Sequence, residues 1–333
     1  MNGVMWPMNT LSKAKRLVWG PEQNQASWAY MKMLRESNKN MRVYNICPYI
    51  EVYPFGDGLY GLFNQNCDGM GDVWEYLIVG SEKAMLIDTA FGIGDIKGLC
   101  DLISGGKELI VANTHIGPDH ALGDVRFDPV YCHELEYANI KRRVQPHAWD
   151  YMFDEHGNNR WLQFDKKDLP EYKEFELIPV KNHHIWNLGG DHNIELIYTG
   201  AHATGHSMFL DRKYRRIFAG DVVCSDVINV GSGNDRYCTV ETYHKALTEL
   251  VERLDEFDYI FPGHFMVYLE NNLFLDIKEA LEKIMKDPLK CTYTTHGQDR
   301  QGNPKTTCYM QVRGFSVIQY DPYKGVFQSQ HAD

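Results

Sequence analysis

Two histidines and an aspartate stand close together in the segment VANTHIGPDHALG, at His115, Asp119 and His120. The preceding run, residues 108–113, is apolar and rich in β-branched side chains, which predicts a buried strand. Pro118 and the nearby glycines then predict a turn rather than a helix. A strand that ends in such a loop can direct two imidazoles and a carboxylate to one point, and these ligands suit zinc, manganese or iron. The same residue types also serve ordinary polar turns, so this segment alone leaves both interpretations open.

Four further segments repeat the pattern of a strand followed by a polar residue. The polar residues and their segments are Asp88 in 84–92, His202 and His206 in 196–207, Asp221 in 215–223, and His264 in 258–265. Several such units in a fixed order are hard to obtain by accident, so we interpret them as parts of one chemical centre.

In that order these residues resemble the metallo-β-lactamase-fold superfamily of metallohydrolases, whose loop motif His-x-His-x-Asp-His maps onto His115, Gly117, Asp119 and His120. The resemblance implies an α/β fold, the αββα sandwich of the metallo-β-lactamase type, with metals in the loops along one edge. It also implies three parts of the chain: an N-terminal extension (1–42), a catalytic domain (43–275) and a C-terminal extension with a helix and a β-hairpin (276–333).

The resemblance further implies roles for individual side chains. The implied metal ligands are His115, Asp119, His120, His202, Asp221 (shared between two metals) and His264. Asp119 would also act in catalysis together with metal-bound water. Asp88 and His206 would support the ligands without touching metal.

One residue departs from the family motif. Gly117 stands where the second histidine of the loop is expected, and glycine has no side chain to coordinate a metal. The first metal position would keep His115, His202 and Asp221, whereas the second would keep its full set of ligands. We therefore expect one or two divalent metals per chain, zinc first with iron or manganese as alternatives, and a weakened first site.

Activated water is the nucleophile that such a centre implies, and the chain has no G-x-S-x-G nucleophile elbow. The expected activity is hydrolysis of an ester, lactone, thioester, amide or phosphodiester in a small molecule. Cys224 stands where lactonase relatives place a tyrosine, which disfavours a lactonase and marks Cys224 as a candidate residue of the substrate pocket. The usual glyoxalase-type thioesterase of the superfamily keeps both loop histidines, so Gly117 disfavours that activity as well. Two alternatives stay open. One is a non-haem iron redox enzyme using His115, His202 and Asp221 as a facial triad, and the other is a non-catalytic metal- or ligand-binding scaffold.

Composition narrows the setting. The net charge is −11 with no long basic block, so nucleic acid is not an expected partner. No run of 18 or more apolar residues is present, which predicts no membrane-spanning helix. The eight cysteines form no C-x-x-C pair, and the N-terminal residues lack the apolar stretch of a secretory signal. These features predict reduced thiols and a cytoplasmic protein.

Periodicity predicts the supporting elements. Amphipathic helices are expected at 24–37, 95–105 and 240–257, and a β-hairpin in 290–333 that packs over the core or a neighbouring subunit, which allows a homo-oligomer. The aromatic-rich segment 125–190 is compatible with either a pocket wall or an extra packing layer. The pair His183-His184 is expected to belong to a hairpin rather than to a metal site.

Overall fold

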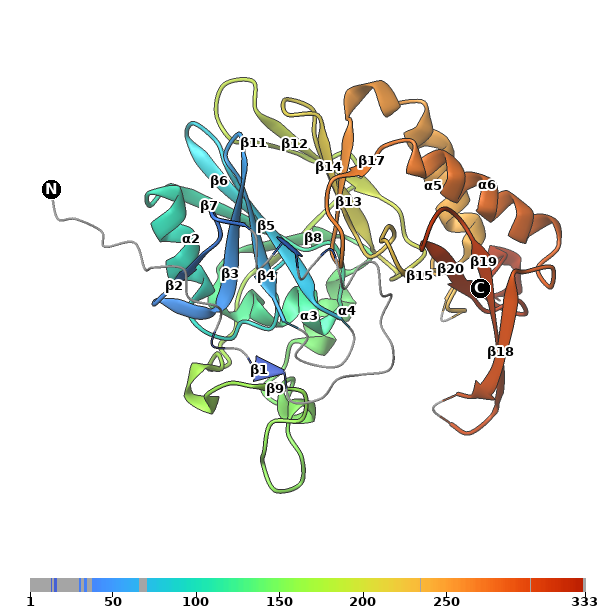
Figure 1. The fold of residues 1–333 in the computed structure, drawn as a ribbon, viewed down its shortest axis with the longest axis horizontal. Coiled ribbons are helices and arrows are strands. Elements are labelled where there is room, and N and C mark those ends of the chain that lie inside the picture. The colour runs from blue at the N-terminus through green and yellow to red at the C-terminus, as the bar shows by residue number, and fades with distance from the viewer. Residues whose placement is uncertain are drawn as a thin grey trace, which may run out of the picture. The chain divides into compact units, whose positions relative to one another are not determined.

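The computed structural model of the protein describes residues 13, 15–16, 30, 33–34, 38–65, 71–233, 235–299 and 301–331 (Figure 1). The helix predicted at 24–37 lies mostly outside these residues. The chain divides into two compact units. The first comprises residues 1–180 and 185–194, and the second comprises residues 181–184 and 195–333.

An eight-stranded sheet forms the centre of the first unit. Its strand order is β10-β8-β7-β6-β5-β4-β3-β2. The strands are β2 (Arg42–Tyr44), β3 (Cys47–Gly56), β4 (Leu59–Asn64), β5 (Val73–Val79), β6 (Lys83–Ile87), β7 (Glu108–Ala112), β8 (Val130–His133) and β10 (Leu177–Val180). β2 to β6 pair as antiparallel neighbours, whereas β6, β7, β8 and β10 run parallel. Because parallel strands end at the same edge, residues that follow β6 and β7 are brought together.

Helices and short turns connect these strands. They are α2 (Ile96–Ser104), α3 (Pro118–Ala121), η1 (Leu122–Arg126), α4 (Tyr137–Arg143), η2 (Asp150–Met152) and η3 (Lys166–Asp168), with a small β1 (Lys15–Arg16) and β9 (Leu162–Gln163) pair. The helix predicted at 95–105 is confirmed as α2, capped by Asp95 and ended by Gly105 in the left-handed region at φ 71°.

Two sequence-based expectations for this unit are settled by the structure. The prediction of a turn without helix after β7 was wrong, because Pro118 begins the one-turn helix α3, a position where its missing N–H costs nothing. The aromatic-rich segment contributes Trp149, Met152 and Phe164 to the buried core, so these residues form a packing layer.

A six-stranded sheet follows, in the order β11-β12-β13-β14-β16-β17. The strands are β11 (Ile185–Asn187), β12 (Asn193–Tyr198), β13 (Ser207–Asp211), β14 (Arg216–Gly220), β16 (Tyr259–Pro262) and β17 (Leu269–Glu270). β14 and β16 run parallel, so the residues after them share one edge. β11 and the start of β12 are grouped with the first unit, and the remaining strands with the second.

The second unit also contains two long helices, α5 (Val240–Val251) and α6 (Leu273–Lys286), and the short turns η4 (Leu254–Glu256) and η5 (Gln328–Gln330). Figure 1 shows α5 and α6 side by side, and both bury residues in one cluster that includes Tyr243, Leu247 and Ile277. The helix predicted at 240–257 is confirmed, although it ends at Val251 and a 3₁₀ turn follows.

A four-stranded sheet completes this unit, in the order β15-β20-β19-β18. Its strands are β15 (Val227–Asn229), β18 (Tyr293–Gln298), β19 (Pro304–Gln311) and β20 (Val317–Tyr320). The predicted C-terminal hairpin is confirmed by the antiparallel pairing of β18 and β19. No helix in the described part of the chain combines the length and apolar character that a membrane span requires.

Candidate metal centre

Asp88 organises the polar residues at the edge of the first sheet. It follows β6, and its backbone adopts the left-handed region at φ 63°, a strained conformation for a residue with a β-carbon. Its Oδ1 accepts the backbone N–H of Thr114 at 2.7 Å, and its Oδ2 accepts the Thr114 hydroxyl at 2.8 Å. Since Thr114 follows the neighbouring parallel strand β7, the carboxylate ties the two strand ends together.

The same carboxylate orients His120. Asp88 Oδ2 lies 2.8 Å from His120 Nδ1, so the imidazole donates from Nδ1 and its Nε2 carries the lone pair. That Nε2 lies 3.7 Å from Asp119 Oδ2. A carboxylate on the far nitrogen of an imidazole is the arrangement that commonly supports metal-binding histidines.

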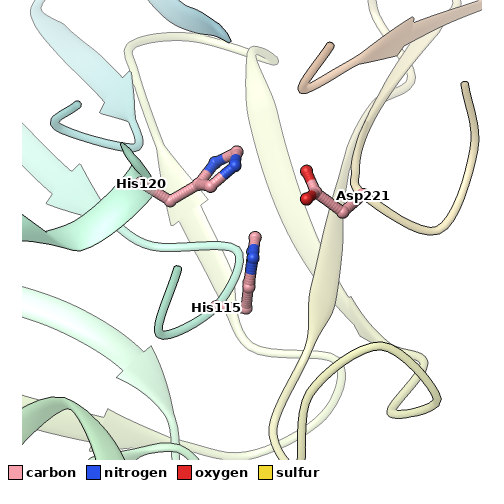
Figure 2. Close-up of side chains that lie close together, drawn as sticks. All are labelled: His115, His120 and Asp221. Carbon is pink, nitrogen blue, oxygen red and sulfur yellow. The ribbon is translucent and has the colours of Figure 1, made fainter. Parts of the chain in front are cut away.

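His115 is oriented through Thr114. Its Nδ1 lies 3.0 Å from Thr114 Oγ1, whose only proton is already directed at Asp88. His115 Nδ1 must therefore donate, which leaves Nε2 as the nitrogen with a lone pair. The rings of His115 and His120 lie with their centroids 4.3 Å apart, and Figure 2 shows the two imidazoles beside each other.

Gly117 provides the space for these side chains. A β-carbon at this position would lie 2.7 Å from His115 Nε2, 2.8 Å from His120 Cδ2 and 2.9 Å from Asp119 Oδ1. All three distances are shorter than ordinary van der Waals contact. The departure from the loop motif therefore has a steric reason in this chain, since a side chain at 117 would displace three candidate ligands at once.

Further buried residues hold the loop and were not identified from sequence. The Glu136 carboxylate accepts the backbone N–H of Ile116 at 2.8 Å. Asn113 donates to the backbone oxygen of His120 at 3.1 Å and to Asp124 Oδ1 at 3.0 Å. No local pattern marks these residues, because each acts on a partner brought close only by the fold.

Burial governs the charge states of the carboxyls behind the loop. Burial raises the pKa of Asp88, and the opposing effects of His120 and of the Thr114 hydrogen bonds limit that rise. Burial also raises the pKa of Asp124 to about 8, against hydrogen bonds from Asn113 and Thr89. The buried Asp124 carboxyl is therefore mostly protonated and uncharged at neutral pH.

In the second unit, Asp221 and His264 follow the parallel strands β14 and β16. The backbone N–H of Gly263 donates to the oxygen of Gly220 at 2.8 Å, which aligns the two strand ends. His264 Nε2 consequently lies 3.4 Å from Asp221 Oδ2. His202 joins them with its Nε2 at 3.5 Å from the same oxygen, while its Nδ1 donates to the backbone oxygen of Asn229 at 2.8 Å.

His206 has a different environment. Its Nδ1 donates to the Thr199 hydroxyl at 2.7 Å, because that hydroxyl donates to the His206 backbone oxygen. Its Nε2 accepts the backbone N–H of Asp221 at 3.1 Å. Both ring nitrogens thus bind protein groups, and the residue positions Asp221 in the way that a supporting histidine would.

Two other residues singled out from the sequence lie in structural settings. Cys224 is buried, its Sγ donates to the Val227 oxygen at 3.2 Å, and burial raises its pKa far above the usual value. This environment is that of a buried thiol in the core of the second unit. His183 Nδ1 lies 2.7 Å from Glu195 Oε1, in an ion-pair network with Arg253 rather than with the candidate ligands.

A family model described as the metallo-beta-lactamase superfamily matches residues 69–296 of the chain. The chain belongs to this superfamily. The acyl-coenzyme A thioesterases MBLAC2 of Gallus gallus and Homo sapiens are each 23% identical to it over 243 residues, which is 66% of this chain and 82% of theirs.

Solved structures of metallo-β-lactamase-fold proteins are similar as well. A metallo-beta-lactamase family protein from Thermus thermophilus has a TM-score of 0.51 and 20% identity, and covers 70% of this chain and 82% of its own. The metallo-beta-lactamase from Pontibacter korlensis has a TM-score of 0.51 and 14% identity over 70% of this chain and 99% of its own. The expected fold class, α/β of the metallo-β-lactamase type, and the expected enzyme class, a hydrolase of this fold, are confirmed.

Each unit contains its own histidines and carboxylates that could serve as metal ligands. They are His115, Asp119 and His120 in the first unit, and His202, Asp221 and His264 in the second. Nitrogen and carboxylate donors are a suitable set for zinc and related divalent ions, as the superfamily implies. The hydrogen bonds also fit, because His115, His120 and His202 each engage Nδ1 and present Nε2.

Proposed function

We propose that this protein is a metal-dependent thioesterase that hydrolyses acyl thioesters of small molecules, with zinc as the metal. The proposed ligands are His115, Asp119 and His120 in the first unit, and His202, Asp221 and His264 in the second unit. The observation that carries the proposal is the shared tautomer of three histidines, whose Nδ1 atoms are bound by Asp88, Thr114 and the Asn229 backbone. His206 shares this tautomer, but its Nε2 accepts a backbone N–H, whereas the Nε2 atoms of His120 and His202 face carboxylate oxygens.

A divalent metal in this position would lower the pKa of water from 15.7 to about 7 and polarise a carbonyl oxygen. Other residues of the chain hold the metal-binding side chains in position. Asp221 is kept in place through its backbone by His206, and its Oδ2 faces both His202 and His264. Asp119 Oδ2, beside His120, is the group proposed to accept a proton from the attacking water.

The thioester is the bond that the relatives' names favour among those that such a site can hydrolyse. Three relatives from three species carry the name acyl-coenzyme A thioesterase, and each matches 82% of its own length. A nucleophilic thiol is not needed for this reaction, and Cys224 is not placed as one. Of the expected substrates, which were an ester, lactone, thioester, amide or phosphodiester, we therefore propose the thioester.

The test uses the full chain loaded with zinc and a series of acyl-coenzyme A substrates, each compared with an oxygen ester of the same acyl group. We expect thioester hydrolysis that is lost with a chelator and restored by zinc. Asp221→Asn should abolish thioester hydrolysis. Asp150→Asn is the control, because that side chain is 75% exposed, and it should leave the rate of hydrolysis unchanged. Thioester hydrolysis that persists in metal-free protein, or in Asp221→Asn, would exclude the proposal.

Metal analysis of protein purified without added metal distinguishes the alternatives left open by the sequence. Zinc with hydrolysis supports the thioesterase. Iron together with oxygen consumption would instead establish the redox enzyme, and metal binding without any turnover would establish the scaffold.

A further inference from the structure

The second unit contains two cysteines whose side chains meet near the C-terminal hairpin. Cys308 lies on β19 directly opposite Thr294 of β18. Cys291 precedes β18, after a turn in which its backbone N–H donates to the Leu289 oxygen at 3.2 Å. The Cys291 sulfur lies 3.2 Å from the Thr294 hydroxyl, which in turn lies 3.7 Å from the Cys308 sulfur.

The two thiols share the Thr294 hydroxyl as a neighbour, and they differ in character. Burial works against a thiolate at Cys291, but hydrogen bonds from Thr294 and Cys308 outweigh it and hold the Cys291 pKa below the usual value. Burial and the bond to Cys291 raise the pKa of Cys308. One sulfur is therefore suited to attack and the other to remain protonated beside it.

Access from solvent is also unequal. Cys291 is partly exposed and lines a surface cavity of about 590 Å³, together with Lys283, Lys286 and Lys290. Cys308 is only 1% exposed and belongs to the core of the unit. A small oxidant can therefore reach Cys291 first.

We propose that Cys291 and Cys308 are a reversible redox pair, in which a hydroperoxide oxidises Cys291 and Cys308 resolves the product as a disulfide. In the first step the Cys291 thiolate attacks one oxygen of hydrogen peroxide, the O–O bond breaks, and hydroxide leaves to become water on protonation. Cys291 is then a sulfenic acid. In the second step the Cys308 thiol attacks that sulfur, the S–O bond breaks, and the oxygen leaves as water with the thiol proton. Two thiols lose two hydrogens, and one peroxide becomes two waters.

This pair and the candidate ligands come from different segments of the chain, since Cys291 precedes β18 and Cys308 lies on β19. The disulfide would join the turn before β18 to β19 and so close the hairpin covalently. A dithiol reductant would reverse the step by thiol–disulfide exchange.

The experiment treats the folded full chain with hydrogen peroxide, blocks remaining thiols and digests without reduction. Trypsin cleaves after Lys290 and Lys305, so the two cysteines fall in different peptides and a disulfide appears as a cross-linked pair. We expect the thiol count to fall by two from the eight cysteines of the chain, and to be restored by dithiothreitol. Cys308→Ala should trap the sulfenic acid at Cys291 for labelling by dimedone.

Cys132→Ser, at a buried thiol of the first unit, is the matched control and should leave the cross-link unchanged. Should Cys308→Ala fail to fold, dimedone labelling of the unmodified chain at short times reports the same intermediate. A chain whose Cys291 and Cys308 both stay reduced until it unfolds, or whose Cys291 pairs with another cysteine, would overturn the proposal.

Discussion

Gly117→Ala tests whether the glycine is a steric requirement of the loop rather than a lost ligand. The added β-carbon would lie within 2.9 Å of three side chains, those of His115, His120 and Asp119. The backbone itself would accept alanine, since Gly117 has φ −46° and ψ 135°. Any loss must therefore come from the contacts and not from strained dihedral angles.

The expected change in the stability of the Gly117→Ala apoprotein follows from two opposing effects. Overpacking in a filled interior costs about 1–3 kcal/mol. Replacing glycine by alanine at a compatible backbone returns about 0.4–1 kcal/mol through the unfolded chain. The apoprotein should thus lose about 1–2 kcal/mol of stability. Metal affinity should fall further, by about 10–100-fold, because displaced donors resemble the loss of a supporting group.

Chemical denaturation of the apoprotein measures the first quantity, and zinc titration against a competing chelator measures the second. Gly297→Ala on β18 is the matched control, because a β-carbon there meets no atom within 4 Å. Gly117→His restores the family's motif, yet its β-carbon meets the same three side chains, so we expect it to weaken the site as well. A Gly117→Ala protein as stable as Gly297→Ala, with unchanged zinc affinity, would refute the steric argument.

Four further substitutions have definite expected outcomes. Asp88→Asn places an amide where one oxygen serves two donors, so zinc affinity in the same titration should fall by about 10–100-fold, and an unchanged value would contradict the assigned role. His202→Ala should remove bound zinc, whereas His206→Ala should retain it and reduce turnover, and the reverse order in metal analysis would show that their roles are exchanged. Asp124 has a folded pKa of about 8 against 3.8 in the unfolded chain, so its contribution to stability is lost as pH rises through that interval. Asp124→Asn should therefore be more stable than the unmodified chain by about 1–3 kcal/mol at pH 8 but not at pH 4. Chemical denaturation that gives the same stability difference between the two proteins at both pH values would argue against this.

The order of strands and donors was accessible from sequence because it depends on local pattern. Apolar runs ending in a polar residue predicted β7 and β14 with the residues that follow them. The tertiary contacts were not accessible. The role of Thr114 could not be predicted, because only the parallel pairing of β6 and β7 brings this loop residue to Asp88. From the sequence, Gly117 was interpreted only as a missing ligand. The structure shows that a side chain at this position would collide with His115, Asp119 and His120.

Backbone strain near the candidate metal ligands also could not be predicted from the sequence. It is one reason why these side chains have defined directions. Asp88, Ala201 and Phe265 all adopt the left-handed region, at φ 63°, 65° and 62°. Ala201 immediately precedes His202, and Phe265 immediately follows His264. Such a conformation costs on the order of 1 kcal/mol for a residue with a β-carbon, so it persists only where surrounding bonds impose it.

Those bonds are present at two of the strained positions. The Asp88 N–H donates to the Ala112 oxygen at 2.9 Å, and the Ala201 N–H donates to the Tyr237 oxygen at 2.7 Å. Each bond connects the strained residue to a segment distant in sequence, so the direction of the neighbouring donor depends on the whole unit being folded. The residues beside the candidate ligands are therefore positioned by hydrogen bonds to distant segments rather than by the loops' own preferences. For this reason, substitutions that break these hydrogen bonds should disturb metal binding even where no ligand is changed.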